Sequence, residues 1–443
     1  MRIVQPYKRI LVFILSLILW ISLVAAWSIV WMQCYATGIL RPFGYKGNWL
    51  VIAVYGILLF FFTSIYGGYR IGYYRGGDIA FSGILAMLIT NGITYLQASL
   101  IGRELLDILP FALLSLVQTL IIVVWAVLSG KLYIRVFPPW EMLMVYGGDK
   151  LSQSLIEKMS TRKEKYHICE KINIDQGLDN VYEAILRYKA VIISDVLSPQ
   201  RNSIIKYCYD RNIRVYMTPK LSDIIIRGAN DISLFDSPLL LLRGTGLSVE
   251  QLFMKRLLDI IVSLIALIIT APFMVLIAIA IKIEDRGPIF YKQERLTKDG
   301  KIFEVLKFRS MVPDAEKKTG VILAREDDNR ITTVGKIIRK TRCDELPQFI
   351  NIIKGDMSVV GPRPERPGIA EEYTATIPEF SFRLKVKAGL TGYAQVIGRY
   401  NTSAYDKLKM DMMYIANYSF FKDIALILMT VKILFIKEST QGF

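Results

Sequence analysis

The architecture of this chain depends on residues 257–283, which read LLDIIVSLIALIITAPFMVLIAIAIKI. The run is apolar and long enough to enter a bilayer. Pro272 lies near its middle and can bend a helix sharply, because proline removes one backbone hydrogen bond. The two ends carry the cations Lys255, Arg256, Lys282 and Arg286. Since cations favour the cytoplasmic side, we expect a re-entrant helix hairpin over about 255–283, with an ordinary kinked fifth span as the alternative.

Four more apolar runs precede residue 135, and each approaches the ~20 residues that cross a bilayer: 10–33, 49–67, 79–101 and 107–129. Basic residues gather before the first run, after the second and after the fourth: Arg2, Lys8, Arg9, Arg70, Arg75, Lys131 and Arg135. The opposite side carries fewer cations, which are Arg41, Lys46 and Arg103. We therefore expect a four-helix transmembrane bundle over residues 1–135, with the amino terminus and everything beyond residue 130 in the cytoplasm.

The composition agrees with a membrane protein of several parts. The chain has 443 residues, of which 53% are hydrophobic, and a formal net charge of +16. Such a basic chain suits an anionic membrane face or phosphate-bearing substrates, and no nucleic acid partner is expected. The four cysteines show no CxxC spacing, so neither a disulfide framework nor a zinc site is expected. The single histidine, His167, lies in a charged stretch, which argues against histidine-based acid–base chemistry.

Residues 136–248 alternate short apolar runs with polar helical stretches, as in a small α/β domain. The apolar runs are 142–146, 190–194 and 213–217. Gly147-Gly148-Asp149 follows the first run and resembles the start of a dinucleotide-binding loop, but the full GxGxxG motif is missing. We expect a Rossmann-like cytoplasmic module over 136–248 that binds no ligand, with a dinucleotide-binding module as the alternative.

Two adjacent carboxylates, Asp344 and Glu345, lie in the sequence RCDELPQ, which ends at Gln348. The proline after them favours the first turn of a helix, so the acids are expected at a helix amino terminus, where free N–H groups attract anions. Asp344, Gln348 and Asn351 share one helix face at spacings of four and three, as in the wall of a site. Simple helix capping by the acids is the alternative.

Basic residues accompany these acids. Lys307 and Arg309 lie in residues 301–311, which read as a strand, and their spacing of two places both on one face; a solvated face is the alternative. Two prolines restrict the backbone around Arg363 in Gly-Pro-Arg-Pro. Further cations are Arg330, Lys336, Arg339, Lys340 and Arg342. Such crowding is costly without anionic partners, so a site for anionic reactants is indicated.

Taken in chain order, these motifs resemble the bacterial sugar transferases, which are monotopic polyprenyl-phosphate phosphoglycosyl transferases. The resemblance rests on KFRSM at 307–311, DELPQ at 344–348, KGDMSVVGPRP at 354–364, GLTGYAQV at 389–396 and Gly398-Arg399. It covers about residues 253–440 and implies an α/β catalytic domain over 249–443 that includes the re-entrant hairpin. The four apolar runs and the middle module look like the large family members that start capsule, exopolysaccharide or O-antigen repeat units.

The resemblance implies a reaction. A sugar 1-phosphate, by default of a hexose, would pass from a UDP-sugar to undecaprenyl phosphate at the cytoplasmic face of the bacterial inner membrane, with release of UMP. Asp344 would be the nucleophile that forms a covalent aspartyl phosphosugar intermediate, and Glu345 would help to bind Mg²⁺. The positions that match substrate contacts are Lys307, Arg309, Arg339, Arg363, Gln395 and Arg399. A homodimer is expected by analogy.

Four positions depart from the family pattern. Ala271 precedes Pro272 where serine is usual, and Ile397 stands where asparagine often precedes Gly-Arg. Ala388 and Tyr393 stand where proline and tryptophan are common. The departures at 388, 393 and 397 affect the expected sugar or nucleotide contacts of that loop, and none of the four affects the two-step chemistry.

Two other functions compete with the phosphoglycosyl transferase. One is a catalytically inactive membrane regulator or scaffold of polysaccharide assembly. The other is an inverting glycosyl transferase, which would release UDP in place of UMP. The resemblance also strengthens the expectation of re-entry, because a full span at 257–283 would place the catalytic part outside the cell, away from nucleotide sugars.

Overall fold

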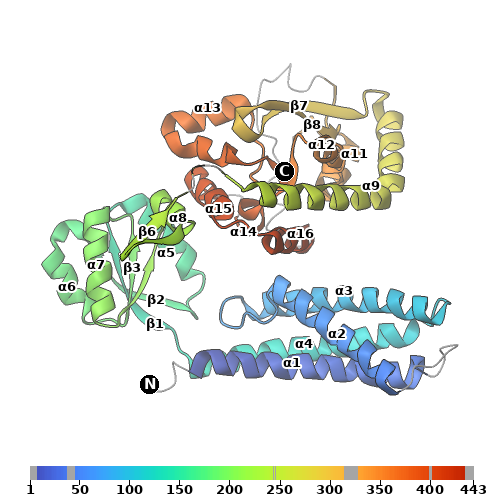
Figure 1. The fold of residues 1–443 in the computed structure, drawn as a ribbon, viewed down its shortest axis with the longest axis horizontal. Helices are drawn as coiled ribbons and strands as arrows, with labels where there is room; N and C mark the ends of the chain where they lie inside the picture. Colours follow the sequence, from blue (N-terminus) through green and yellow to red (C-terminus); the bar gives the residue numbers. More distant parts are fainter. Residues whose placement is uncertain are drawn as a thin grey trace. The chain divides into compact units, whose positions relative to one another are not determined.

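The computed structural model describes residues 7–36, 45–242, 244, 246–313, 328–398 and 402–434. They form two compact units, Met1–Pro219 and Lys220–Phe443 (Figure 1). Unit 1 holds long apolar helices and a parallel sheet, and unit 2 holds the segment with the adjacent acids. The mixed helical and α/β class expected from the sequence is thus observed. The three-part division after residues 135 and 248 stays a prediction.

Unit 1 begins with the apolar helices α1 (Lys8–Val30), α2 (Tyr45–Tyr66), α3 (Gly76–Gly102) and α4 (Leu109–Val136). A helix therefore forms at each of the four predicted apolar runs. Large apolar side chains such as Leu96 and Leu116 are exposed on them, as a lipid environment allows. Among the described residues, five helices are long and apolar enough to cross a membrane, the fifth lying in unit 2. Membrane association is therefore indicated.

Buried polar side chains join these four helices. Asn91 of α3 accepts a hydrogen bond from Tyr55 of α2 at 2.9 Å and donates one to Gln118 of α4 at 3.0 Å. Gln118 also donates to the carbonyl of Leu23 in α1 at 3.0 Å. Polar groups inside an apolar helix assembly need protein partners, and this network supplies them. The helices of unit 1 therefore pack as one assembly, whereas their placement across a bilayer stays a prediction.

A parallel sheet follows in unit 1, with the strand order β2-β1-β3-β4. Its strands are β1 (Trp140–Tyr146), β2 (Tyr166–Asn173), β3 (Ala190–Ser194) and β4 (Arg214–Met217), and its helices are α5 (Asp149–Ser160), α6 (Leu178–Ile185) and α7 (Ser198–Asp210). The predicted strands at 142–146, 190–194 and 213–217 are observed. The sequence pattern does not predict β2, because this strand is polar and most of its side chains are partly or fully exposed.

Two glycines after β1 are required by a close approach of two loops. A Cβ atom at Gly147 or Gly148 would overlap Asp195, which lies in the turn after β3. These two loops lie at the carboxyl ends of neighbouring strands, where dinucleotide-binding folds hold their ligand. Packing against Asp195 therefore explains the glycine pair without a bound ligand.

Unit 2 begins with α8 (Leu221–Arg227) and an exposed antiparallel hairpin of β5 (Asn230–Leu234) and β6 (Ser237–Leu241). Helix α9 (Val249–Asp285) leads to a second antiparallel hairpin of β7 (Phe290–Leu296) and β8 (Ile302–Phe308). The later elements are α11 (Thr333–Lys340), α12 (Gln348–Lys354), β9 (Ser358–Val360), α13 (Pro367–Thr376), η6 (Pro378–Lys385), β10 (Gly389–Thr391), α14 (Tyr393–Ile397), α15 (Ala404–Ala416) and α16 (Phe420–Leu434). Their core includes Val305, Ile352, Met357 and Leu408.

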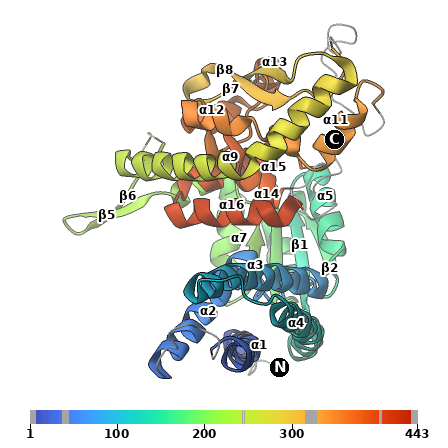
Figure 2. The same cartoon turned by 90° about the vertical axis from the view of Figure 1, so that its right-hand side faces the viewer.

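Helix α9 is bent and is anchored to unit 2 near both ends. Its ribbon turns sharply near the middle in both views (Figures 1 and 2), and Pro272 lies inside the helix. Near its start, Arg256 donates to the carbonyls of Ile352 and Ile353, each at 2.6 Å. At its end, Glu284 accepts a hydrogen bond from the first backbone N–H of α11 at 2.7 Å. Both ends of this apolar helix are therefore hydrogen-bonded to other elements of unit 2.

Candidate active site

The two adjacent acids lie in a short 3₁₀ turn, η5 (Cys343–Glu345), which Leu346 and Pro347 separate from α12. The expectation that they lie at a helix start therefore agrees with the structure. Arg342 precedes them in the left-handed backbone region, with φ at 56°. Residues other than glycine rarely adopt this conformation, and it is often found at functional sites. The turn buries Asp344, whose exposed fraction is 9%.

Two cations from distant segments contact Glu345. The Lys307 ammonium of β8 donates to Oε1 of Glu345 at 2.8 Å. The Arg363 guanidinium lies 3.8 Å from the same oxygen. The structure thus brings together three residues that the sequence analysis singled out in separate motifs, in addition to Asp344.

Burial and charge give the two carboxyls different proton affinities. Burial raises the pKa of Asp344 to about 6, and the neighbouring Glu345 charge adds to the rise, while Lys307 and Arg339 oppose it. Burial also opposes ionisation of Glu345, but Lys307 and Arg363 outweigh it and hold the pKa of that carboxyl at about 2. At neutral pH Glu345 is therefore a fixed anion, and Asp344 is ionised but close to its titration range.

Asn351 fastens β8 to α12 and so positions Lys307. Its side chain accepts from the backbone N–H of Leu306 at 2.9 Å and donates to the Glu304 carbonyl at 2.8 Å. The expected polar face of Asp344, Gln348 and Asn351 is buried, at exposed fractions of 9%, 3% and 2%. Asn351 thus has backbone partners in the neighbouring strand, which a helical periodicity cannot reveal.

Arg309 lies apart from Lys307. Its guanidinium pairs with Asp285 at the end of α9 and donates to the Pro288 carbonyl at 2.6 Å. Strand β8 ends at Phe308, so the alternation of strand faces does not continue to Arg309. The structure gives Arg309 protein partners, and its assignment to substrate stays a prediction.

Two of the three remaining predicted substrate contacts lie among the described residues. Arg339, on α11, is close enough to Asp344 to lower its pKa. The Oε1 atom of Gln395, on α14, is buried and has no hydrogen-bond partner among the described residues, so it could accept one from a ligand. Arg399 lies outside the described residues.

Glu345 suits a Mg²⁺ ion that is shared with a substrate. Mg²⁺ is usually held by one or two carboxylates, several waters and substrate phosphates. Glu345 supplies a carboxylate, and the described residues contain no group of three metal-ligating side chains that could form an all-protein cage. The donor set therefore fits a metal that arrives with a phosphate-bearing ligand.

Three charged residues near this site were not predicted from the sequence; Arg383 and Asp411 are buried, and Arg295 is half-buried. Arg295 of β7 donates to the Pro364 carbonyl at 3.1 Å. Arg383 of η6 donates to the Arg363 carbonyl at 3.1 Å and pairs with Asp411 of α15 at 2.8 Å. In the sequence, Arg383 is distinguished only by its position six residues before the Gly-Leu-Thr-Gly motif. That position does not indicate which residues Arg383 contacts.

Comparison with known proteins shows which family unit 2 is similar to. The family described as bacterial sugar transferase matches residues 250–437. The chain is 34% identical over 274 residues, 60% of its length, to an Aeromonas hydrophila UDP-N-acetylgalactosamine-undecaprenyl-phosphate N-acetylgalactosaminephosphotransferase. It is 37% identical over 267 residues, 59% of its length, to a Klebsiella pneumoniae UDP-glucose:undecaprenyl-phosphate glucose-1-phosphate transferase. These matches span 63% and 56% of the two relatives.

A shorter relative is covered almost completely. The exopolysaccharide production protein PSS of Rhizobium leguminosarum bv. phaseoli is 38% identical over 200 residues, which are 98% of that protein and 43% of this chain. The similarity to this relative therefore covers nearly its whole length.

Proposed function

Because this chain belongs to the bacterial sugar transferase family, we propose that unit 2 transfers a sugar 1-phosphate from a UDP-sugar to undecaprenyl phosphate. The observation that carries the proposal is the cluster of Asp344 and Glu345 with the cations Lys307 and Arg363. The names of the relatives from Aeromonas hydrophila and Klebsiella pneumoniae mention undecaprenyl phosphate, which supports the acceptor, and they mention UDP-sugars, which supports the donor. A hexose is the default sugar.

Asp344 is the nucleophile of the proposed reaction. One of its carboxylate oxygens bonds to the phosphorus that carries the sugar, as the bond between that phosphorus and the UMP oxygen breaks. UMP leaves with the electron pair of the broken bond. An oxygen of the lipid phosphate then bonds to the same phosphorus, and the aspartyl oxygen leaves as a carboxylate. The products are UMP, a polyprenyl diphosphate sugar and the original Asp344.

The environment of Asp344 suits this role. With a pKa of about 6 the carboxyl is mostly ionised at neutral pH, so no general base is needed to activate it. Its burial keeps it poorly solvated, and a carboxylate that water solvates poorly is a better nucleophile. Glu345 carries its own charge at the same time and keeps Lys307 in place.

The cations and a bound metal would share the charge of the reactants. Lys307 and Arg363 are positioned to neutralise phosphate oxygens next to Asp344. Glu345 would hold Mg²⁺, which when bound supplies positive charge to the donor diphosphate. Arg339, Gln395 and Arg399 belong to the proposed donor contacts.

The form of α9 supports a membrane placement for this chemistry. The helix bends near Pro272, exposes apolar side chains on both sides of the bend, and binds unit 2 near both of its ends. A hairpin that enters one leaflet and returns would place the acids near the lipid phosphate. We therefore place the reaction at the cytoplasmic face of the bacterial inner membrane, at the start of capsule, exopolysaccharide or O-antigen repeat-unit assembly.

Nucleotide release tests the proposal. Membranes that contain the chain are supplied with undecaprenyl phosphate, Mg²⁺ and a panel of UDP-sugars, and UMP and UDP are quantified. We expect UMP with at least one sugar, and no UMP from Asp344→Asn. The matched control is Asp299→Asn, in an exposed turn of unit 2 where the backbone is left-handed and asparagine is well tolerated. UDP in place of UMP would indicate an inverting glycosyl transferase, and no nucleotide release with any sugar would favour the scaffold.

A further inference from the structure

The loop that carries Arg363 is fixed at consecutive carbonyl groups. Residues 362–365 read Pro-Arg-Pro-Glu, and each of their carbonyls accepts a hydrogen bond. The four bonds are Gly389 N to Pro362 O at 2.8 Å, Arg383 Nη2 to Arg363 O at 3.1 Å, Arg295 Nη1 to Pro364 O at 3.1 Å, and Leu296 N to Glu365 O at 3.0 Å. Two backbone N–H groups and two arginine side chains therefore hold the four carbonyl groups of this loop.

Arg383 has more partners than the other donors. It is 5% exposed, and besides the Arg363 carbonyl it contacts two carboxylates. Its Nη1 donates to Glu365 at 3.3 Å, and its Nη2 lies 2.8 Å from Oδ2 of Asp411, which is 1% exposed. Arg383 thereby links the loop to α15, a helix that contains none of the predicted site residues.

The position of the Arg363 backbone depends on few torsions. Pro362 and Pro364 have fixed φ angles, and the proline after Arg363 also restricts the backbone of Arg363 itself. The remaining freedom lies mainly in the φ and ψ of Arg363. A donor on the Arg363 carbonyl limits the ψ rotation, and this rotation would move the side chain relative to Glu345. Arg383 is that donor.

We propose that Arg383 is a positioning residue of the transfer reaction, which holds the Arg363 guanidinium beside Glu345 through the Arg363 carbonyl and is itself held by Asp411 and Glu365. The inference rests on the proposed function, because it assigns Arg363 to the phosphate site. It goes beyond that function by giving two residues outside the recognised motifs, Arg383 and Asp411, a part in the reaction.

A purely stabilising role explains this arrangement less well. A buried ion pair is weak evidence for stability, because apolar residues of similar volume often stabilise as well or better.

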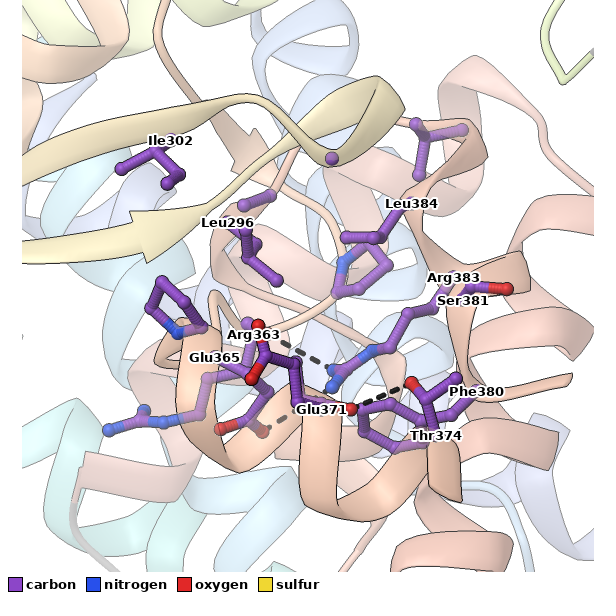
Figure 3. Close-up of a pocket in the computed structure, with 16 residues that line it drawn as sticks. Leu296, Ile302, Arg363, Glu365, Glu371, Thr374, Phe380, Ser381, Arg383 and Leu384 are labelled. Atoms are coloured by element: carbon purple, nitrogen blue, oxygen red, sulfur yellow. Dashed lines mark hydrogen bonds and ion pairs between the residues drawn. The ribbon is translucent and has the colours of Figure 1, made fainter. Parts of the chain in front are cut away.

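Arg383 also lines a pocket of about 350 Å³ with Leu296, Phe380 and Ala388 among its walls. Figure 3 shows the Arg383 side chain reaching the Arg363 carbonyl and the Glu365 carboxylate, while the Arg363 side chain points away from them. Arg383 therefore bonds Arg363 at its backbone carbonyl, whereas the guanidinium of Arg363 is the part that lies beside Glu345.

A double-mutant cycle on the full chain tests the inference. The rate of UMP release is measured for Arg363→Ala, Arg383→Ala and the double variant. If Arg383 acts through Arg363, Arg383→Ala loses about 100-fold in kcat, as a misplaced contact does. The double variant is then no slower than Arg363→Ala alone. Losses that multiply in the double variant would overturn the inference. Lys385→Ala, which removes a cation from the same η6, is the control and should keep the wild-type rate.

A second measurement does not depend on turnover. Hydrogen exchange of the segment 358–366 is compared between the wild type and Arg383→Lys, which keeps the charge beside Asp411 but loses the forked geometry. We expect faster exchange in this segment and unchanged exchange in α12; unchanged exchange in both would overturn the inference. A wild type that releases no UMP contradicts the proposed function, whereas the exchange result still decides whether Arg383 holds the loop.

Discussion

The Lys307 ammonium donates to the Glu345 carboxylate at 2.8 Å, and this contact joins β8 to the turn that carries Asp344. It places a cation where it favours the ionised form of both acids. Burial acts against ionisation of both, and the result is one carboxyl that stays charged and one that titrates near pH 6. The electrostatics of the site therefore depend on a long-range pair whose members are 38 residues apart.

The first prediction concerns pH. Asp344 reacts as a carboxylate, and its raised pKa of about 6 means that the reactive form is lost as the pH falls through 6. We expect the second-order rate constant for the first release of UMP to be flat above pH 7 and to fall tenfold per pH unit well below 6. The assay should omit the lipid phosphate and follow one turnover, since protonation of the acceptor would add its own acid limb. A profile that stays flat down to pH 4.5 would contradict the assignment.

Removal of the Lys307 charge should weaken the reaction and shift its pH dependence. Lys307 favours the ionised form of Asp344, so Lys307→Met should raise the pKa of Asp344 and move the acid limb to higher pH. Loss of a cation beside the reacting phosphate should lower kcat by about 100-fold. Lys292→Met is the control, because Lys292 forms an exposed ion pair with Glu304 on the same hairpin and should show neither effect.

Substitutions of Arg309 and of its partner Asp285 distinguish a structural role of Arg309 from a substrate-binding role. Arg309 is 6% exposed, so Arg309→Met or Asp285→Asn should each lower the stability of unit 2 by about 2 kcal/mol, the typical value of a hydrogen bond to a charged group. We expect a lower thermal midpoint for both variants, and a purely structural role of Arg309 also predicts an unchanged KM for the UDP-sugar in both. If Arg309 contacts substrate, Arg309→Met raises KM and Asp285→Asn does not.

The course of α9 can be tested by thiol labelling. Asp299→Cys is introduced into a chain whose native cysteines are replaced by alanine, and an impermeant thiol reagent is added to vesicles of either orientation. Re-entry predicts that position 299 reacts from the same side as Tyr73→Cys, in the loop after α2. A complete span predicts reaction from the side of Leu105→Cys, in the loop after α3. Both control positions are exposed, at 65% and 85%.

The sequence predicts the local features of this protein well, because their cause is local. Helices follow the four apolar runs, strand β3 coincides with residues 190–194, and the acids lie shortly before α12. Each of these depends on hydrophobic periodicity or on a proline at a helix start, which act within a few residues. Strand β2 is missed because its polar side chains, most of them partly or fully exposed, give no such signal.

The partners of the charged side chains are a property of the tertiary structure alone. Lys307 and Arg309 are two residues apart, yet one pairs with Glu345 and the other with Asp285, because β8 ends between them. Arg383 has no recognisable motif, but packing of η6 and α15 against the Arg363 loop makes it a donor to that loop. The chemistry-bearing residue types were thus evident from the sequence. Their pairing, burial and pKa values result from contacts between segments that are distant along the chain.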